Sequence, residues 1–305
     1  MKPLLRRLLL CGALPVLLVT LAVWSWAPRE PSWAGRSLSD WLKDFEPARM
    51  RNPSAVDEQN AAAARRAIQG MGTNCLPILL RRIGRVEPAP LEKMLIKLEE
   101  FLAEQEVKIP WTPTQTRLEV GVSDACDAVN ALGHQAVPAI PELKRWLLSS
   151  SDVKVSMGAY LLANIAPEGI EVLIAASTNR TVLNRAAVAG RLHSIASEHP
   201  QAFTALLAMT ADADPSVRGQ AGFLITSGRY EAAVIWPVIN RLLADVERSV
   251  RREILRKLDR FRGDLRPAEP ALTALLTDPD PEIRSQANAL LDKIKAQSFT
   301  PSPAP

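Results

Sequence analysis

Apolar residues recur every three or four positions through most of the chain, and short breaks rich in Gly, Pro and Asp separate the periodic segments. One clear run consists of Val250, Ile254, Leu258 and Phe261, whose spacing places them on one face of a helix. A stripe of this kind is typical of an amphipathic helix that buries one side and exposes the other. The pattern therefore predicts an all-helical chain.

Two segments in the first half of the chain repeat the same landmarks. Residues 67–79 and 128–140 each read as a helix end, a Gly, a short turn and a Pro that begins the next helix. Gly72 and Gly133 can adopt the left-handed conformation that ends a helix. The Pro lies in the first turn of a helix, where a backbone N–H would have no intrahelical acceptor, so the missing N–H of Pro costs no hydrogen bond. Each segment therefore predicts a hairpin of two helices.

A different landmark repeats in the second half. Segments 214–221, 247–254 and 280–287 align with one another, and their first apolar residue recurs at intervals of 33 and 33 residues. Asp214 is expected to cap a helix whose first position is Pro215, and the segment at 280–287 begins with the same Asp-Pro pair. A regular interval of this length indicates an array of structural repeats.

When these segments are aligned, one equivalent position in each holds a small or apolar residue, and these positions form a column of the alignment. Successive residues of the column are 61, 31, 28, 34, 33 and 33 residues apart, and the first interval is long because it contains an insertion at about 84–122. The column predicts about six two-helix units and a terminal helix over residues 56–297, stacked as an α-solenoid in which each unit completes its neighbour's core. The column consists of Ala67, Ala128, Ala159, Ala187, Ala221, Ile254 and Ala287.

The Asp-Pro-Ser-Val-Arg-Gly-Gln-Ala segment at 214–221 resembles the HEAT repeat, an armadillo-type helical unit, in its short bacterial form. The Gly-Arg-Ser-Leu-Ser-Asp-Trp-Leu segment at 35–42, the hairpin at 61–80 and a spacer ending at 107–113 are similar, in the same order, to a bacterial family of membrane-tethered HEAT-repeat proteins. The resemblance implies a HEAT-type solenoid held at a membrane. Since that family has no assigned biochemical activity, the resemblance implies no substrate and no site.

The N-terminus has the pattern of a membrane anchor. An uncharged stretch, 8–27, follows three basic residues and is long enough as a helix to cross the hydrocarbon core. The basic flank keeps that end in the cytoplasm, so the solenoid would face the periplasm of a bacterial inner membrane as part of a single-pass protein. The alternative is a cleaved signal peptide and a secreted protein, although Pro28 directly after Ala27 makes a poor cleavage site.

Connecting segments flank the array. Residues 28–55 are expected to form a stalk with a short helix that docks on the first repeat, because Ser37 and Asp40 have capping-box spacing. The insertion contains one amphipathic helix. Residues 298–305 have the Pro- and Ser-rich composition of a disordered tail.

Composition narrows the classes of function. The net charge of +4 is mostly contributed by basic residues ahead of the apolar leader, so no nucleic-acid partner is expected. Cys75 and Cys126 lie in apolar helical stretches and are expected to be buried small hydrophobes. His134, His193 and His199 share no metal-ligand spacing, and no nucleophile or phosphate-loop motif occurs. We therefore expect no metal, no cofactor and no enzymatic activity.

Candidate partner-binding residues lie near the second helices of the repeats. Trp146 and Trp236 are candidate aromatic anchors, provided that they are partly exposed. The cationic residues Lys144, Arg145 and Arg241 lie close to them in sequence. A lone tryptophan is more often a packing residue, so both roles stay open at this point.

The most charged stretch, residues 248–266, holds eight Lys and Arg residues against three acidic ones. It would either bind an acidic partner or form the solvated face of a helix whose other face is apolar. Charge runs usually have the second role, which is favoured here. In that interpretation Arg251, Arg252, Arg256 and Arg260 all line the exposed side.

These observations favour a non-catalytic scaffold that binds a protein partner on a concave surface lined by the second helices. One alternative is a repeat-fold enzyme of the lyase type, which would gather ionisable groups across repeats. The other is a structural envelope component that binds nothing specific. A coherent charged or aromatic stripe on the surface would favour binding, and a buried polar cluster would favour catalysis.

The anchor generates the first testable prediction. If residues 8–27 stay attached, the full chain resists extraction from membranes by high salt or alkaline carbonate and is released only by detergent. Fractionation followed by N-terminal sequencing checks this. A mature N-terminus near Pro28 would contradict the anchor and leave a secreted protein.

Overall fold

The computed structural model describes residues 30–85, 88–107, 112–228 and 230–298, and both the expected anchor at 8–27 and residues 299–305 of the expected tail lie outside these ranges. Among the residues that it describes, no helix combines the length and apolarity needed to span a bilayer. Contacts divide the chain into two compact units, residues 1–78 and residues 79–305. Each unit is described by itself.

Unit 1 begins with a small hairpin that the sequence pattern did not reveal. β1 (Ser32–Trp33) pairs antiparallel with β2 (Arg36–Ser37). Both residues of the turn have positive φ, 48° and 78°, as a two-residue hairpin turn with matching twist requires. Trp33 lies against Gly70, where an added Cβ would be 2.6 Å from the indole ring, so this contact depends on a glycine.

Two short helices pack on the long helix of this unit. α2 (Leu38–Leu42) and α3 (Phe45–Ala48) both contact α4 (Ala55–Met71). The hydroxyl of Ser37 caps α2 by accepting a hydrogen bond from the Asp40 N–H at 3.2 Å, as the capping-box spacing indicated. The short helix expected to dock on the first repeat is therefore present.

The first repeat continues past a tight turn. After α4, the 3₁₀ turn η1 (Gly72–Cys75) leads into α5 (Leu76–Gly84), and Gly72 has a φ of 60°. The Cys75 thiol is fully buried and donates to the Gly72 carbonyl at 2.9 Å. Burial raises its pKa to about 11, so the group is a packing residue rather than a reactive thiol.

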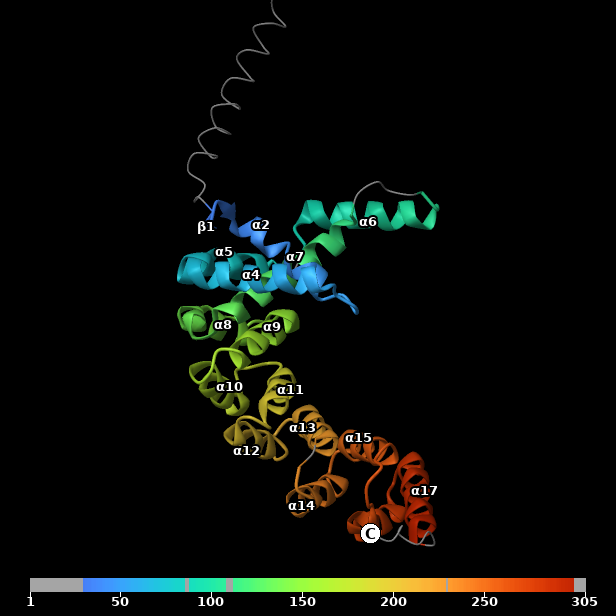
Figure 1. Cartoon of the computed structure of the whole chain (residues 1–305). Coiled ribbons are helices and arrows are strands. Elements are labelled where there is room, and N and C mark those ends of the chain that lie inside the picture. Colours follow the sequence, from blue (N-terminus) through green and yellow to red (C-terminus); the bar gives the residue numbers. More distant parts are fainter. Residues whose placement is uncertain (1–29, 86–87, 108–111, 229, 299–305) are drawn as a thin grey trace, which may run out of the picture. The chain divides into compact units, whose positions relative to one another are not determined.

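Unit 2 is a double layer of helices that follow one another in alternation (Figure 1). The insertion helix α6 (Pro90–Glu104) precedes them. The first layer consists of α7 (Thr114–Leu132), α9 (Asp152–Ala163), α11 (Arg185–Ile195), α13 (Pro215–Ser227), α15 (Arg248–Asp259) and α17 (Pro281–Ser298). The second layer consists of α8 (Ile140–Leu147), α10 (Glu168–Thr178), α12 (Pro200–Met209), α14 (Ala232–Leu243) and α16 (Glu269–Ala274). The 3₁₀ turns are η2 (Gly133–Ala139), η3 (Arg266–Ala268) and η4 (Leu275–Thr277).

This element order confirms the prediction of an all-helical array of two-helix repeats. Within the described residues, six successive helix pairs, α4–α5 through α15–α16, precede the terminal helix α17. The second pair starts earlier than the sequence suggested. α7 is already helical at Thr114, so residues 114–122 belong to it and the segment added between the first two pairs is shorter than 84–122.

Small side chains let the first-layer helices approach one another. The column positions Ala128, Ala159, Ala221 and Ala287 are all fully buried. A Cβ added to Gly222 would lie 2.4 Å from Leu242 Cδ1, so a larger residue here would force the Leu242 side chain to move. Close approach of this kind buries apolar area that a single helix pair cannot cover alone.

Neighbouring helices within each layer differ in how closely they approach. Consecutive first-layer helices from α9 to α15 are in extensive contact, and so are α10 and α12 of the second layer, whereas α7 with α9, α8 with α10 and α14 with α16 touch only sparsely. In Figure 1 the row from α9 to α17 lies on the inner side of the bend in unit 2, and α10, α12 and α14 lie on its outer side. Within unit 2, the expectation that the second helices line a concave surface is therefore wrong, because they lie on the outer side of the bend.

A ladder of ion pairs joins consecutive repeats of unit 2. Each guanidinium reaches a carboxylate 27 residues further along the chain, and the arginines and aspartates each recur every 33 residues. All six side chains are at least 87% buried. The pairs are Arg185–Asp212 at 2.8 Å, Arg218–Asp245 at 2.7 Å and Arg251–Asp278 at 2.7 Å.

The central pair shows how each rung is built. Arg218 also donates from Nη1 to the carbonyls of Asp212 and Ala213, at 2.9 and 3.0 Å, so it ties its own turn to the next one. Asp245 accepts a further bond from the Glu247 N–H at 2.9 Å. The Arg218 side chain, aided by that backbone bond, holds the pKa of Asp245 below its usual value.

The ladder generates the second prediction. Replacing Arg218 by Ala leaves the Asp245 carboxylate buried without its partner, and the free energy of unfolding should fall by about 3 kcal/mol. The matched control is Arg256→Ala, since Arg256 forms an exposed pair with Glu253, and its loss should cost less than about 1 kcal/mol. Urea titration followed by far-UV circular dichroism measures both. Equal losses would contradict a structural role for the ladder.

The same pair predicts an acid dependence. Because the folded-state pKa of Asp245 is lowered, its contribution to stability is complete above the ordinary carboxyl pKa of about 4 and is lost as the pH falls through the folded value. The Asp245→Asn variant should be less stable at pH 7 and should lose less stability than the parent between pH 5 and pH 2. An unchanged acid profile would contradict this account.

Candidate functional site

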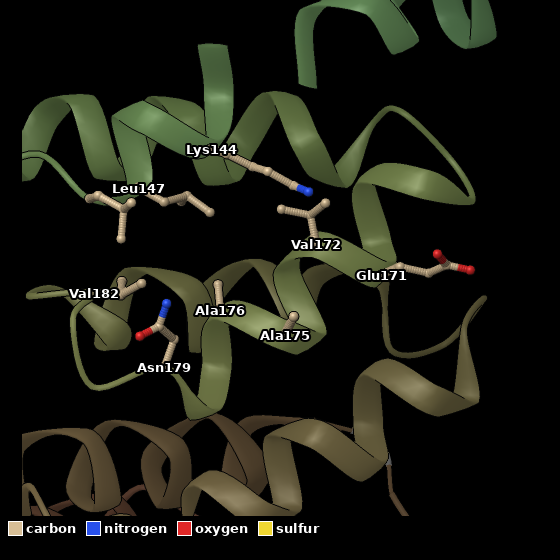
Figure 2. A pocket seen from close by; sticks show the side chains of 9 residues that line it. Lys144, Leu147, Glu171, Val172, Ala175, Ala176, Asn179 and Val182 are labelled. Carbon is tan, nitrogen blue, oxygen red and sulfur yellow. The ribbon is translucent and has the colours of Figure 1, made fainter. Parts of the chain in front are cut away.

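A groove opens between α8 and α10, where the second layer is loosely packed. Its volume is about 340 Å³. Figure 2 shows the side chains that line it from the two helices and from the turn that follows α10. Its apolar lining consists of Leu147, Leu148, Val172, Ala175, Ala176 and Val182.

The residues that line the groove differ in how far they are exposed. Leu147, Ala176 and Val182 are buried and form a fixed floor. Leu148 is 52% exposed and Ala175 is exposed as well, so these two offer apolar surface to an incoming group. Small side chains on α10 leave the space that larger residues would fill. An open apolar cleft with a few polar groups is the usual form of a ligand site.

Charged and polar groups lie around this apolar lining. Lys144 extends from α8 toward Val172, whereas the Glu171 carboxylate points outward from α10 and Asn179 lies at the opposite end (Figure 2). In the part of the chain that the structure describes, no carboxylate lies within ion-pair distance of Lys144, and no cation lies within that distance of Glu171. The rim therefore carries one positive and one negative group that a partner can pair.

The two candidate tryptophans are packing residues. Trp146 is 6% exposed and donates from Nε1 to Glu142 at 3.1 Å. Its Cβ lies 3.2 Å from the position that a Cβ on Gly158 would take, which shows how tightly α8 and α9 meet. Trp236 is 8% exposed and makes an edge contact with Phe261 at 5.7 Å between ring centroids. The expectation of partial exposure is wrong for both, since each indole completes the interior of its repeat.

The three candidate cations have separate environments. Lys144 lies on the groove. Arg145 forms an exposed ion pair with Glu142 on the same helix. Arg241 donates to the Thr210 hydroxyl at 2.6 Å, a contact between α14 and the end of α12. The structure thus places one of these residues at the groove and leaves the other two in local contacts.

The basic stretch at 248–266 is largely neutralised by its neighbours. Arg251 is buried in the ladder, so placing it on the exposed side was wrong. The sequence could not show this because its partner lies 27 residues away. The exposed arginines on α15 line a polar hollow of about 430 Å³, and each has a carboxylate within reach. Their contacts are Arg248 with Asp280 and Glu282, Arg252 with Glu282 at 3.5 Å, and Arg256 with Glu253 at 2.7 Å.

His193 and Cys126 contribute to packing and local polar contacts. His193 shares a 2.9 Å hydrogen bond with the Tyr230 hydroxyl, and burial together with nearby Lys257 lowers the pKa of its ring. Cys126 is buried and contacts the sulfur of Met157 at 3.5 Å. Across the described residues, no group of three His, Cys, Asp or Glu side chains is arranged to hold a metal ion.

Comparisons with known proteins add little to this picture. No family model matches the chain, and no curated protein matches it. An engineered protein of known structure is 19% identical over 84% of this chain and 97% of its own, with a TM-score of 0.28. A designed armadillo repeat protein, solved in complex with the peptide (KR)4, is 17% identical over 85% of this chain and 100% of its own, with a TM-score of 0.27. Scores this low support no argument about function.

The different environments of Trp146 and Lys144 give the third prediction. Trp146→Ala removes a buried indole and should lower the free energy of unfolding by about 3–5 kcal/mol. Lys144→Ala removes an exposed side chain and should change it by no more than about 0.5 kcal/mol. Chemical denaturation of the full chain measures both. A stable Trp146→Ala variant would mean that this indole is not a packing residue.

Proposed function

We propose that this protein is a non-catalytic scaffold that captures a segment of another protein in the groove between α8 and α10. The observation that carries the proposal is an open apolar cleft whose rim holds Lys144 without a carboxylate partner among the described residues. The binding surface proposed from the sequence, the second-helix layer, is retained. However, this layer lies on the outer side of the bend in unit 2, and not in the concave groove that the sequence led us to expect.

The chemistry of the groove describes its partner. The apolar floor accepts one large side chain such as Leu or Phe, whose burial contributes about 1.5–3 kcal/mol. An acidic residue next to that side chain would pair with Lys144, and a basic residue further along would approach Glu171. These contacts alone give weak binding. A stable complex therefore needs further contacts or several copies of the segment.

The sequence also supports a proposal for where the scaffold is located. We propose that residues 8–27 anchor it in the inner membrane of a bacterium, with the repeats in the periplasm, as in the membrane-tethered HEAT-repeat family that the chain resembles. The support is the uncharged leader with its basic flank and the segments at 35–42 and 214–221.

Photo-crosslinking tests the proposed groove. A photoreactive amino acid placed at Ala175 in the full chain should yield a discrete adduct in cells, because this residue is exposed on the groove wall. The same amino acid at Ala233, an exposed residue of the second-layer helix α14, should not give that adduct. Adding Lys144→Glu to the Ala175 probe should reduce the yield at least tenfold.

A competition variant separates groove binding from chance proximity. Ala175→Trp should fill the groove and abolish capture by a photoreactive residue at Leu148, whereas Ala233→Trp should have no effect. The proposal is wrong if the adduct forms equally from Ala175 and Ala233, or if it survives both Lys144→Glu and Ala175→Trp.

A further inference from the structure

Arg284, in the first turn of α17, repeats the ladder arginine one step further along the chain. It follows Arg251 by 33 residues. Its Nη1 donates to the carbonyls of Asp278 and Pro279 at 2.6 and 3.0 Å. Arg218 and Arg251 bind the carbonyls six and five residues before them in the same way. The Arg284 guanidinium is therefore held by its own turn as a ladder residue is held.

The other edge of this guanidinium is open. In Arg218, Nε and Nη2 donate to the two carboxylate oxygens of Asp245, at 2.7 and 2.8 Å. Within the described residues, no carboxylate lies within ion-pair distance of Arg284, and its Nε and Nη2 have no acceptor. The side chain is half-buried. An edge of this shape fits a carboxylate, which accepts two parallel hydrogen bonds from it.

The three complete rungs show which carboxylate fits best. In each rung the arginine binds an aspartate, and Oδ1 of that aspartate also accepts the N–H two residues further on, at 2.8 to 2.9 Å. Asp suits this local turn because its short side chain reaches its own backbone two residues on. The group that matches the open edge of Arg284 is therefore an aspartate in a turn of this kind.

We propose that Arg284 binds the aspartate of such a turn in another protein. Its guanidinium is oriented before binding, which reduces the entropy lost when the pair forms. A further stacked repeat is disfavoured as the occupant, because Asn288 is exposed where the equivalent residue one repeat earlier, Leu255, is buried. A second copy of this chain is disfavoured as well, because each of its ladder aspartates is already paired with its own arginine. The site is independent of the groove between α8 and α10.

One ion pair at a half-buried site binds weakly, so the test traps the complex as a disulfide. The full chain carries Cys11→Ser and Asn288→Cys. Its remaining native cysteines, Cys75 and Cys126, are buried, and position 288 is exposed one helical turn after Arg284.

The probe is the peptide acetyl-Cys-Gly-Gly-Ala-Asp-Val-Glu-amide, whose last four residues copy the ladder turn at 244–247. A second peptide has Asn in place of Asp. In a thiol–disulfide exchange buffer, a peptide that binds next to position 288 raises the yield of the mixed disulfide. Intact-mass spectrometry measures that yield.

The Asp peptide should give at least about fivefold more adduct than the Asn peptide, because a bond to a charged acceptor is stronger than one to a neutral acceptor. Arg284→Gln should remove this preference. Arg284→Lys should also remove most of it, because an ammonium cannot form the two parallel bonds. Arg256→Gln, which changes an exposed arginine of α15, is the matched control and should keep the preference.

Equal adduct from the Asp and Asn peptides overturns the proposal, and this comparison needs no change to Arg284. A preference that survives Arg284→Gln overturns it too, because the carboxylate then binds elsewhere. So does a preference that Arg284→Lys keeps in full, since that result indicates general attraction between opposite charges. Circular dichroism checks that each variant keeps its helical content.

Discussion

From α11 onward, the stacking of the repeats depends on one recurring interaction, in which an arginine of one repeat reaches the aspartate of the next. A two-helix repeat cannot bury its own apolar face, so it must stack on its neighbours in a fixed register. Arg218 sets that register because it binds the carbonyls of its own turn and the carboxylate of Asp245 together. Burying such a pair gains little by itself, but breaking it is costly, and this asymmetry specifies one arrangement.

The registered stacking has a consequence for the surface. Small residues such as Ala221 are buried where first-layer helices meet, and the second-layer helices differ in how closely they approach one another. The groove lies between α8 and α10, which touch only sparsely, and small side chains on α10 line part of it. The proposed binding surface thus depends on the stacking of the repeats, since its two walls, α8 and α10, belong to different repeats.

Much of the fold could be predicted from the sequence, because the repeats carry local signals. Asp-Pro starts, a helix-ending Gly and the 33-residue interval identify helix pairs without reference to tertiary contacts. What escaped prediction depends on distant partners. Arg251 looks like an exposed residue on its own helix, and only the position of Asp278 shows that it is buried. The hairpin of β1 and β2 has two-residue strands, too short to show any periodicity.

The candidate site was predicted less well than the fold. Trp146 and Lys144 are neighbours on α8, and sequence spacing could not decide that one is buried while the other lines a groove. Whether each side chain is buried depends on which side of α8 is covered by α9 and on the distance between α8 and α10. The direction of the bend likewise results from many small differences in helix spacing. No single residue determines it, so it could not be predicted from the sequence.

Selection of displayed random peptides on the full chain tests the central claim most directly, because it can find a binding sequence whatever the natural partner is. The account predicts enrichment of peptides with a large apolar residue beside an acidic one. It also predicts that a selected peptide slows amide hydrogen exchange in α8 and α10. Enrichment that is unchanged on the Ala175→Trp variant, or protection confined to α15, would contradict it.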